Sequence, residues 1–181
     1  GLTTTCNVTN TYNLPQTRLI VNKTAVGGGG TFQYSAASSP PGSGPNFSIS
    51  PITIPSGGGT GTSTNNVPAL GQTYAYYNIT ETMPSTGWII TSASCSTPGT
   101  PSSPVTINGN VMQGIQLWNG LTTTCNVTNT YTGTPIISTS PIPVHGPLGQ
   151  GLFDNATLSG FNNPTGNITF KLYPPSDPNC T

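Results

Sequence analysis

The sequence predicts an all-β protein built from tandem β-sandwich domains. Only 3% of the 181 residues are charged and the formal net charge is zero, whereas disordered chains combine low hydrophobicity with high net charge. Val, Ile, Thr and Tyr are plentiful, and these residues favour pleated, half-buried strands. The 23 Gly and 19 Pro interrupt the chain too often for long helices.

An identical repeat divides the chain into domains. The twelve residues GLTTTCNVTNTY occur at 1–12 and again, without a change, at 120–131. Such self-similarity indicates serial copies of one domain type, and one interval has the size of an ordinary domain. We expect residues 1–12 to close a preceding domain or to be donated to a neighbouring subunit. Residues 13–131 are then a complete β-sandwich, and residues 132–181 an incomplete β domain.

Alternation of apolar and polar residues predicts the individual strands. Residues 57–70 are expected to be a flexible connection or a weak strand, and Pro51 marks an edge strand. Three strands in the last fifty residues cannot enclose a core by themselves. The predicted strands are 1–12, 18–26, 31–36, 47–54, 73–82, 87–96, 105–107, 111–118 and 121–131, followed by 135–144, 151–161 and 167–173.

Charge and composition exclude several classes of function. A chain without a basic cluster cannot neutralise phosphates, so nucleic-acid binding is not expected. No run of about 20 apolar residues is present, so no insertion into a membrane is expected. Four Cys without a CxxC pair and a single His argue against a metal and for disulfides in an oxidising, extracellular setting. With no triad and no paired carboxylates, neither an enzyme nor a cofactor is expected.

Seven Asn-X-Ser/Thr sequons make the chain a candidate glycoprotein. Attached sugar would keep a surface with so few charges soluble. A chain rich in Asn and Thr also forms sequons by accident, so glycan occupancy stays open. The candidates are Asn7, Asn22, Asn46, Asn78, Asn126, Asn155 and Asn167.

Strand parity places the only Lys and the only Glu of the complete domain inside it. Side chains two apart share one face of a strand. Lys23 therefore shares a face with Leu19 and Val21 in RLIVNKT, and Glu81 with Ile79 in YNITET. By the same rule, Asn129 shares the apolar face of CNVTNT. A Lys, a Glu and an Asn are thus predicted to face one core.

This combination predicts a reaction of the protein with itself. Low dielectric favours the neutral forms of a buried Lys and a buried Glu. A neutral Lys23 amine is a nucleophile beside the Asn129 amide, and Glu81 can polarise that amide and shuttle protons. The product is a Lys–Asn isopeptide bond formed with loss of ammonia. The alternative is a buried Lys23–Glu81 ion pair without a covalent bond.

The same residues carry a resemblance to a known family. RLIVNKTAV, YNITET and CNVTNTY resemble the Cna B-type, SpaA-like or prealbumin-like domain of bacterial surface proteins over residues 13–131. The family pattern has a Lys in the first strand, a Glu in a middle strand before a Gly-aromatic turn, and an Asn in the last strand. The resemblance implies the isopeptide bond between Lys23 and Asn129, with Glu81 as its autocatalytic residue.

The resemblance also implies a disulfide between Cys95 and Cys125, because relatives carry a Cys before the closing segment. Cys6 and Cys180 are then left to pair with residues of adjacent domains or with another chain. Both possibilities remain open at this point.

Residues 132–181 have a resemblance of their own. Their motifs DNATLSG, PTGNITFKLY and DPNC are similar to the opening half of an immunoglobulin-like repeat that occurs in tandem in bacterial surface proteins. The two resemblances together imply prealbumin-like and Ig-like sandwiches in series.

These observations favour a structural protein of the cell surface. We expect a segment of an extracellular, pilus-like filament or stalk, stabilised by the isopeptide bond and disulfides, with copies of itself or adjacent repeats as partners and with possible strand exchange between subunits. The alternative is an adhesin whose domains act as spacers or bind a glycan ligand.

Overall fold

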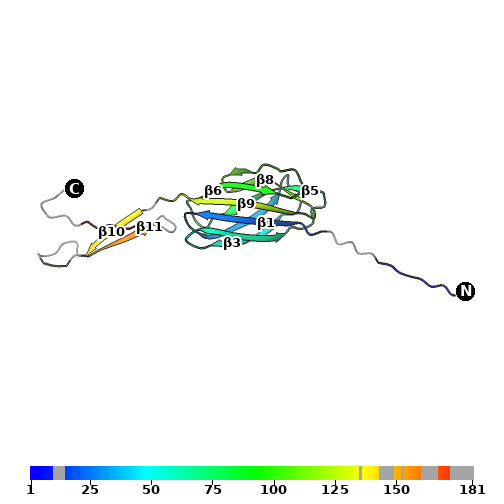
Figure 1. Ribbon diagram of the computed structural model, residues 1–181, viewed down its shortest axis with the longest axis horizontal. Helices are drawn as coiled ribbons and strands as arrows, with labels where there is room; N and C mark the ends of the chain where they lie inside the picture. The colour runs from blue at the N-terminus through cyan, green and yellow to red at the C-terminus, as the bar shows by residue number, and fades with distance from the viewer. Residues whose placement is uncertain (10–14, 135, 143–148, 152, 160–166, 172–181) are drawn as a thin grey trace.

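The computed structural model describes residues 1–9, 15–134, 136–142, 149–151, 153–159 and 167–171. Within these residues the structure is all-β, and nine strands form one sandwich (Figure 1). The strands are β1 (Arg18–Val26), β2 (Gly30–Ser38), β3 (Phe47–Ile54), β4 (Gly59–Asn66), β5 (Tyr74–Thr82), β6 (Trp88–Ser96), β7 (Thr106–Asn108), β8 (Val111–Trp118), β9 (Thr122–Tyr131), β10 (Ile136–Ile142) and β11 (Phe153–Ser159).

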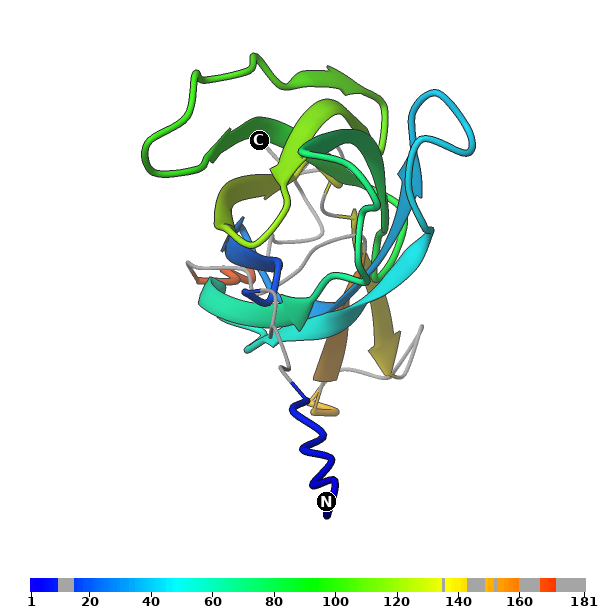
Figure 2. The same cartoon turned by 90° about the vertical axis from the view of Figure 1, so that its right-hand side faces the viewer.

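Two sheets enclose the core of the sandwich. One has the strand order β4-β1-β9-β6 and the other β3-β2-β5-β8-β7. Seen along the long axis, the sheets curve around a common interior (Figure 2). β1 and β9 run parallel, and the remaining pairs are antiparallel. The first and last strands of the sandwich are therefore neighbours that point the same way.

Glycines make the crossing from the first sheet to the second possible. β1 ends before Gly27, whose φ of 83° is a conformation that glycine adopts without steric cost. A Cβ on Gly29 would lie 1.8 Å from the Pro55 carbonyl oxygen. The four-glycine run thus ends one strand and lets the backbone pass close to a neighbouring loop.

The edge strands agree with the local sequence. β3 lies at an edge of its sheet, and its register with β2 shifts beside Pro51, where proline has no amide hydrogen to donate to the ladder. Residues 59–66, expected to be weakly structured, form the edge strand β4. Its inward-facing Ser63 and Asn65 are buried, so a polar segment still contributes to the interior.

Of the three strands predicted after the sandwich, two are confirmed and one is wrong over its described residues. β10 and β11 form a two-stranded antiparallel pair within the predicted ranges 135–144 and 151–161. Residues 167–171 are not in a strand, and Ile168 and Phe170 are 43% and 55% exposed. The prediction of a strand at 167–173 is therefore wrong over those residues, because no neighbouring strand among the described residues pairs with them.

Residues 1–9 are also not in a strand and are exposed, although their sequence is that of β9. The prediction of a strand at 1–12 is wrong for the isolated chain over this part, because a strand requires a partner for its backbone groups. These residues and the β10–β11 pair lie at opposite ends of the sandwich (Figure 1). Their role as a closing or donated strand stays a prediction.

Candidate cross-linking site

Three polar side chains from three strands are buried in the core of the sandwich. Lys23 on β1 is 1% exposed, and Glu81 on β5 and Asn129 on β9 are each 0% exposed. Their neighbours along each strand, such as Val21, Ile79 and Val127, are buried core residues. Strand alternation thus brings an amine, a carboxyl and an amide into one apolar interior.

The sheet topology fixes the relative positions of these residues. In the parallel β1–β9 pair, Lys23 lies opposite Val127, and Asn129 lies opposite Ala25. Lys23 and Asn129 are therefore diagonal neighbours on the same inner face. Glu81 belongs to the facing sheet and contacts Lys23 across the core.

Lys23 and Glu81 form a close ion pair. The Lys23 Nζ lies 2.5 Å from Glu81 Oε1, and both side chains are fully buried. The amine also lies 4.4 Å from the centre of the Phe32 ring, where the electron-rich face of the ring attracts a cation. A charged or partly charged amine is thus held in a fixed direction with no access to water.

Burial changes the protonation of this amine. Burial lowers the pKa of Lys23 to about 8, although the charge of Glu81 and the hydrogen bond to it act in the opposite direction. Lys23 therefore loses its proton more readily than an ordinary lysine does. Tyr34 lies opposite Glu81 on β2, and burial followed by the negative charge of Glu81 raises the pKa of its phenol, which stays protonated.

The amide of Asn129 lacks its usual hydrogen bonds. Its Nδ2 donates to the Met83 Sδ at 3.1 Å, and sulfur is a weak acceptor. Its Oδ1 and the second Glu81 oxygen, Oε2, are buried without a hydrogen-bond partner. Two unpaired acceptors in one core are costly, and a proton on the carboxyl would turn one of them into a donor.

Neighbouring groups hold the site in place and exclude water from it. The backbone N–H of Glu81 donates to the Asn110 carbonyl, and the Asn110 side chain donates back to the Glu81 carbonyl, both at 2.9 Å. The Trp88 ring packs edge-on against Phe32 and Tyr131 at centroid distances of 5.2 Å and 5.3 Å. The arrangement therefore places an amine, a carboxyl and an amide in one dry interior.

Comparison with known families identifies the domain. The model of the family described as a SpaA-type prealbumin-like fold domain matches residues 19–131, which is more than half of the chain. The chain belongs to the SpaA-like family of prealbumin-like fold domains. Such domains are structural, non-enzymatic and typical of pilin-type proteins of the cell surface. No curated protein and no solved structure matches the chain significantly.

A disulfide closes the SpaA-like domain beside this site. Cys95 on β6 and Cys125 on β9 are register partners, and their sulfurs are bonded. The bond joins β9 to β6, its neighbour on the side opposite β1, and Cys125 lies four residues before Asn129. Cys6 is an exposed free thiol, and Cys180 lies outside the described residues.

The sequons lie on outward-facing or loop positions where they are described. Asn22 and Asn126 are register partners on the outer face, and Asn22 Nδ2 donates to Asn126 Oδ1 at 3.1 Å. The two side chains are therefore neighbours across the β1–β9 pair, about one strand spacing of 4.8 Å apart. Asn46 accepts a hydrogen bond from the Ser38 N–H at 3.0 Å. The remaining candidates, half-buried or exposed, are Asn7, Asn78, Asn155 and Asn167.

Sequence reasoning missed two residues of the SpaA-like site. Met83 shares the parity of Ile79 and Glu81, which was a usable signal, but it lies just beyond the strand. Asn110 follows Gly109 in a tight turn, and nothing in its local sequence indicates that it would hold the Glu81 backbone. Within the described residues, no helix is long and apolar enough to cross a membrane, and no group of three His, Cys, Asp or Glu could hold a metal.

Proposed function

We propose that the SpaA-like domain is a load-bearing structural segment of an extracellular filament or stalk, closed by an isopeptide bond between Lys23 and Asn129. The observation that supports this most directly is the buried Lys23–Glu81 pair beside the unpaired Asn129 carbonyl. A buried ion pair on its own contributes little to stability. Its presence in a domain with almost no other charge favours a chemical role.

The proposed reaction balances without an external reagent. Lys23 gives a proton to Glu81 across their hydrogen bond, and the neutral Nζ attacks the Asn129 side-chain carbonyl carbon. The protonated Glu81 polarises the carbonyl oxygen and then carries a proton to the departing nitrogen. The Cγ–Nδ2 bond of Asn129 breaks, an Nζ–Cγ amide forms, and ammonia leaves.

The position of the bond suits a protein under tension. Because β1 and β9 are parallel neighbours, the chain enters the sandwich at one end and leaves at the other (Figure 1). A pull on the two ends shears these strands past each other. A covalent bond from Lys23 to Asn129 would carry the load directly, so residues 24–128 would not be unravelled by force and unfolding would be kinetically slow.

Intact mass spectrometry of the reduced protein tests the bond. The wild-type chain should be lighter than its formula by about 17 Da, the mass of the ammonia released. Lys23→Ala and Asn129→Ala should both have their formula mass. Asn65→Ala is the matched control, because Asn65 is also a buried Asn of the same sheet but lies on β4, and it should retain the mass deficit. A wild-type mass equal to the formula would leave the Lys23–Glu81 ion pair as the whole site.

The repeated segment supports a second proposal, that residues 1–12 fill the β9 position of another SpaA-like domain. Their identity with 120–131 means that each side chain fits that position: Cys6 corresponds to Cys125, and Val8 to the buried Val127. Residues 1–9 are exposed and do not pair with any strand, so they are free to pair with another domain.

Chain length rules out the β9 position of the same domain. A strand parallel to β1 in that position would place residue 12 about 30 Å from Arg18, at about 3.3 Å per residue. The six peptide units between them span at most about 21 Å, and β9 already fills the position. The receiving domain is therefore another copy, next in series or in a neighbouring subunit.

Truncation tests this second proposal. A chain of residues 1–119 carries the donor segment and lacks β9, so it should form head-to-tail polymers that grow with concentration, since such contacts do not close on themselves. Val8→Asp in the same chain should abolish the polymers by placing a charge where Val127 is buried. Light scattering that shows only monomers of the 1–119 chain, or polymers unaffected by Val8→Asp, would contradict strand donation.

A further inference from the structure

The outer face of the five-stranded sheet carries a cluster of exposed aromatic rings. Tyr74 and Tyr76 on β5 are 40% and 39% exposed. The Tyr74 ring centre lies 5.7 Å from that of Tyr76 and 4.9 Å from that of Trp118 on β8. Tyr74 and Trp118 are register partners on neighbouring strands, and none of the three rings belongs to the core.

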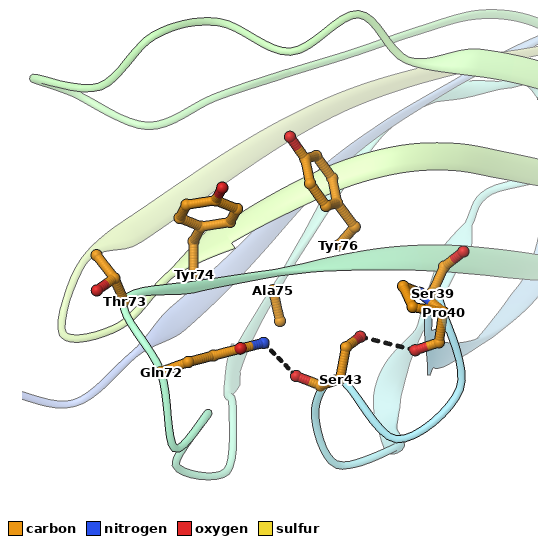
Figure 3. A pocket seen from close by; sticks show the side chains of 8 residues that line it. All are labelled: Ser39, Pro40, Ser43, Gln72, Thr73, Tyr74, Ala75 and Tyr76. Atoms are coloured by element: carbon orange, nitrogen blue, oxygen red, sulfur yellow. Dashed lines mark hydrogen bonds between the residues drawn. The ribbon is translucent and has the colours of Figure 1, made fainter.

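A hollow adjoins these rings. It has a volume of about 310 Å³. Both tyrosines line it, together with the polar residues Ser39, Ser43, Gln72 and Thr73. Figure 3 shows the two tyrosine rings side by side on one side of β5, with Gln72 and Ser43 meeting across the strand. The Gln72 side chain donates to the Ser43 carbonyl, and this bond fixes the loop that borders the hollow.

No charge faces this surface from the described part of the domain. Lys23 and Glu81 are buried in the core, and Arg18 lies on β1, in the other sheet. A charged ligand would therefore find no counter-ion here. The surface offers flat apolar rings and hydroxyl groups.

We propose that this surface binds a neutral carbohydrate. A sugar ring presents an apolar C–H face that packs on an aromatic ring, and it carries hydroxyl groups at its rim that both donate and accept hydrogen bonds. The aromatic rings match the first feature, and the hydroxyl groups of Tyr74, Tyr76, Ser39 and Thr73 match the second. A hollow at the small end of the range for ligand sites suits a short saccharide. This function goes beyond the cross-linked structural role and does not depend on the isopeptide bond.

Titration with defined sugars tests the proposal. The full chain is produced without N-glycosylation, so that no sugar on Asn78 can cover Tyr76 on the same face. The probes are neutral hexasaccharides of glucose, mannose and N-acetylglucosamine, an acidic galacturonate hexasaccharide and a poly-proline peptide. Calorimetry and amide NMR shifts should show saturable binding of at least one neutral sugar, with shifts at Tyr74, Tyr76 and Trp118. No binding of any neutral sugar up to about 10 mM would overturn the proposal, as would tighter binding of the acidic sugar or the peptide.

Substitutions locate the site. Tyr76→Ala should weaken binding at least about ten-fold, and Tyr76→Leu should do the same while keeping apolar volume and the unfolding temperature. Ile89→Ala is the matched control, because Ile89 is 48% exposed on the opposite sheet, and it should bind as the wild type does. Wild-type affinity of the leucine variant would exclude ring stacking, and an equal loss in Ile89→Ala would exclude this surface.

Discussion

Replacing Asn129 by Ala should destabilise the domain far more than replacing a buried Asn that forms no cross-link. The proposed bond closes a loop of residues 24–128, and a cross-link over about 100 residues stabilises by about 4.7 kcal/mol in the chain-entropy model. The Cys95–Cys125 disulfide shortens the effective loop, but the logarithmic dependence changes the figure by only about 0.3 kcal/mol. For a domain of this size we expect the unfolding temperature to fall by about 15–25 °C.

Differential scanning calorimetry of the oxidised protein measures this difference. The control is again Asn65→Ala, which removes hydrogen bonds to the Ser50 N–H, the Leu19 carbonyl and the Ser63 hydroxyl and should cost about 1–3 kcal/mol. Asn129 has only a weak bond to Met83, so without a cross-link its replacement would be the milder of the two. A smaller fall for Asn129→Ala than for Asn65→Ala would refute the reasoning.

Two further predictions concern protonation and the disulfide. In Asn129→Ala the Lys23 amine persists with a pKa of about 8, against 10.5 for an ordinary lysine. Between these values the unfolded state binds more protons than the folded state, so the free energy of unfolding should rise with pH, by up to about 3 kcal/mol. Urea titrations at pH 7.5 and pH 10 measure the rise, and the cross-linked wild type, whose amine has become an amide, should lack this contribution. Joint replacement of Cys95 and Cys125 by Ala should lower the free energy of unfolding by about 3–4 kcal/mol while the mass deficit of the cross-link persists; disappearance of the deficit would mean that the disulfide is needed to align β9.

Strand parity was enough to predict that Lys23, Glu81 and Asn129 face the core. Each lies in a strand whose buried positions alternate along its length, so one register satisfies the whole strand. The buried aromatics Phe32, Tyr34, Tyr77 and Trp88 follow from the same alternation. The contacts between the strands could not be predicted in this way. Parity determines which face of its strand a residue occupies, but it does not determine which residues of other strands lie next to it.

The errors have a common physical cause. Residues 1–9 and 167–171 have the composition of strands but no partner strand in the described chain, and β-structure depends on pairing more than on local preference. Residues 59–66 are the reverse case, since a Gly- and Thr-rich segment becomes β4 because β1 offers it a complete ladder. Local sequence therefore predicts the capacity to form a strand, and tertiary context decides whether the strand forms.

The proposed reaction also accounts for an otherwise unfavourable core. Two buried charges lose their hydration, and their mutual attraction repays that loss only in part, so an apolar pair at Lys23 and Glu81 would give a more stable sandwich before reaction. Formation of the proposed amide would remove the positive charge and leave the proton on Glu81, which could then donate to the new carbonyl. The cost of the ion pair would fall only on the short-lived folded precursor, and the finished domain would keep a neutral, hydrogen-bonded link between its first and last strands. If Lys23 and Glu81 are kept for chemistry, burying them should destabilise the core before the reaction and no longer do so after it. A merely structural ion pair would destabilise the core permanently.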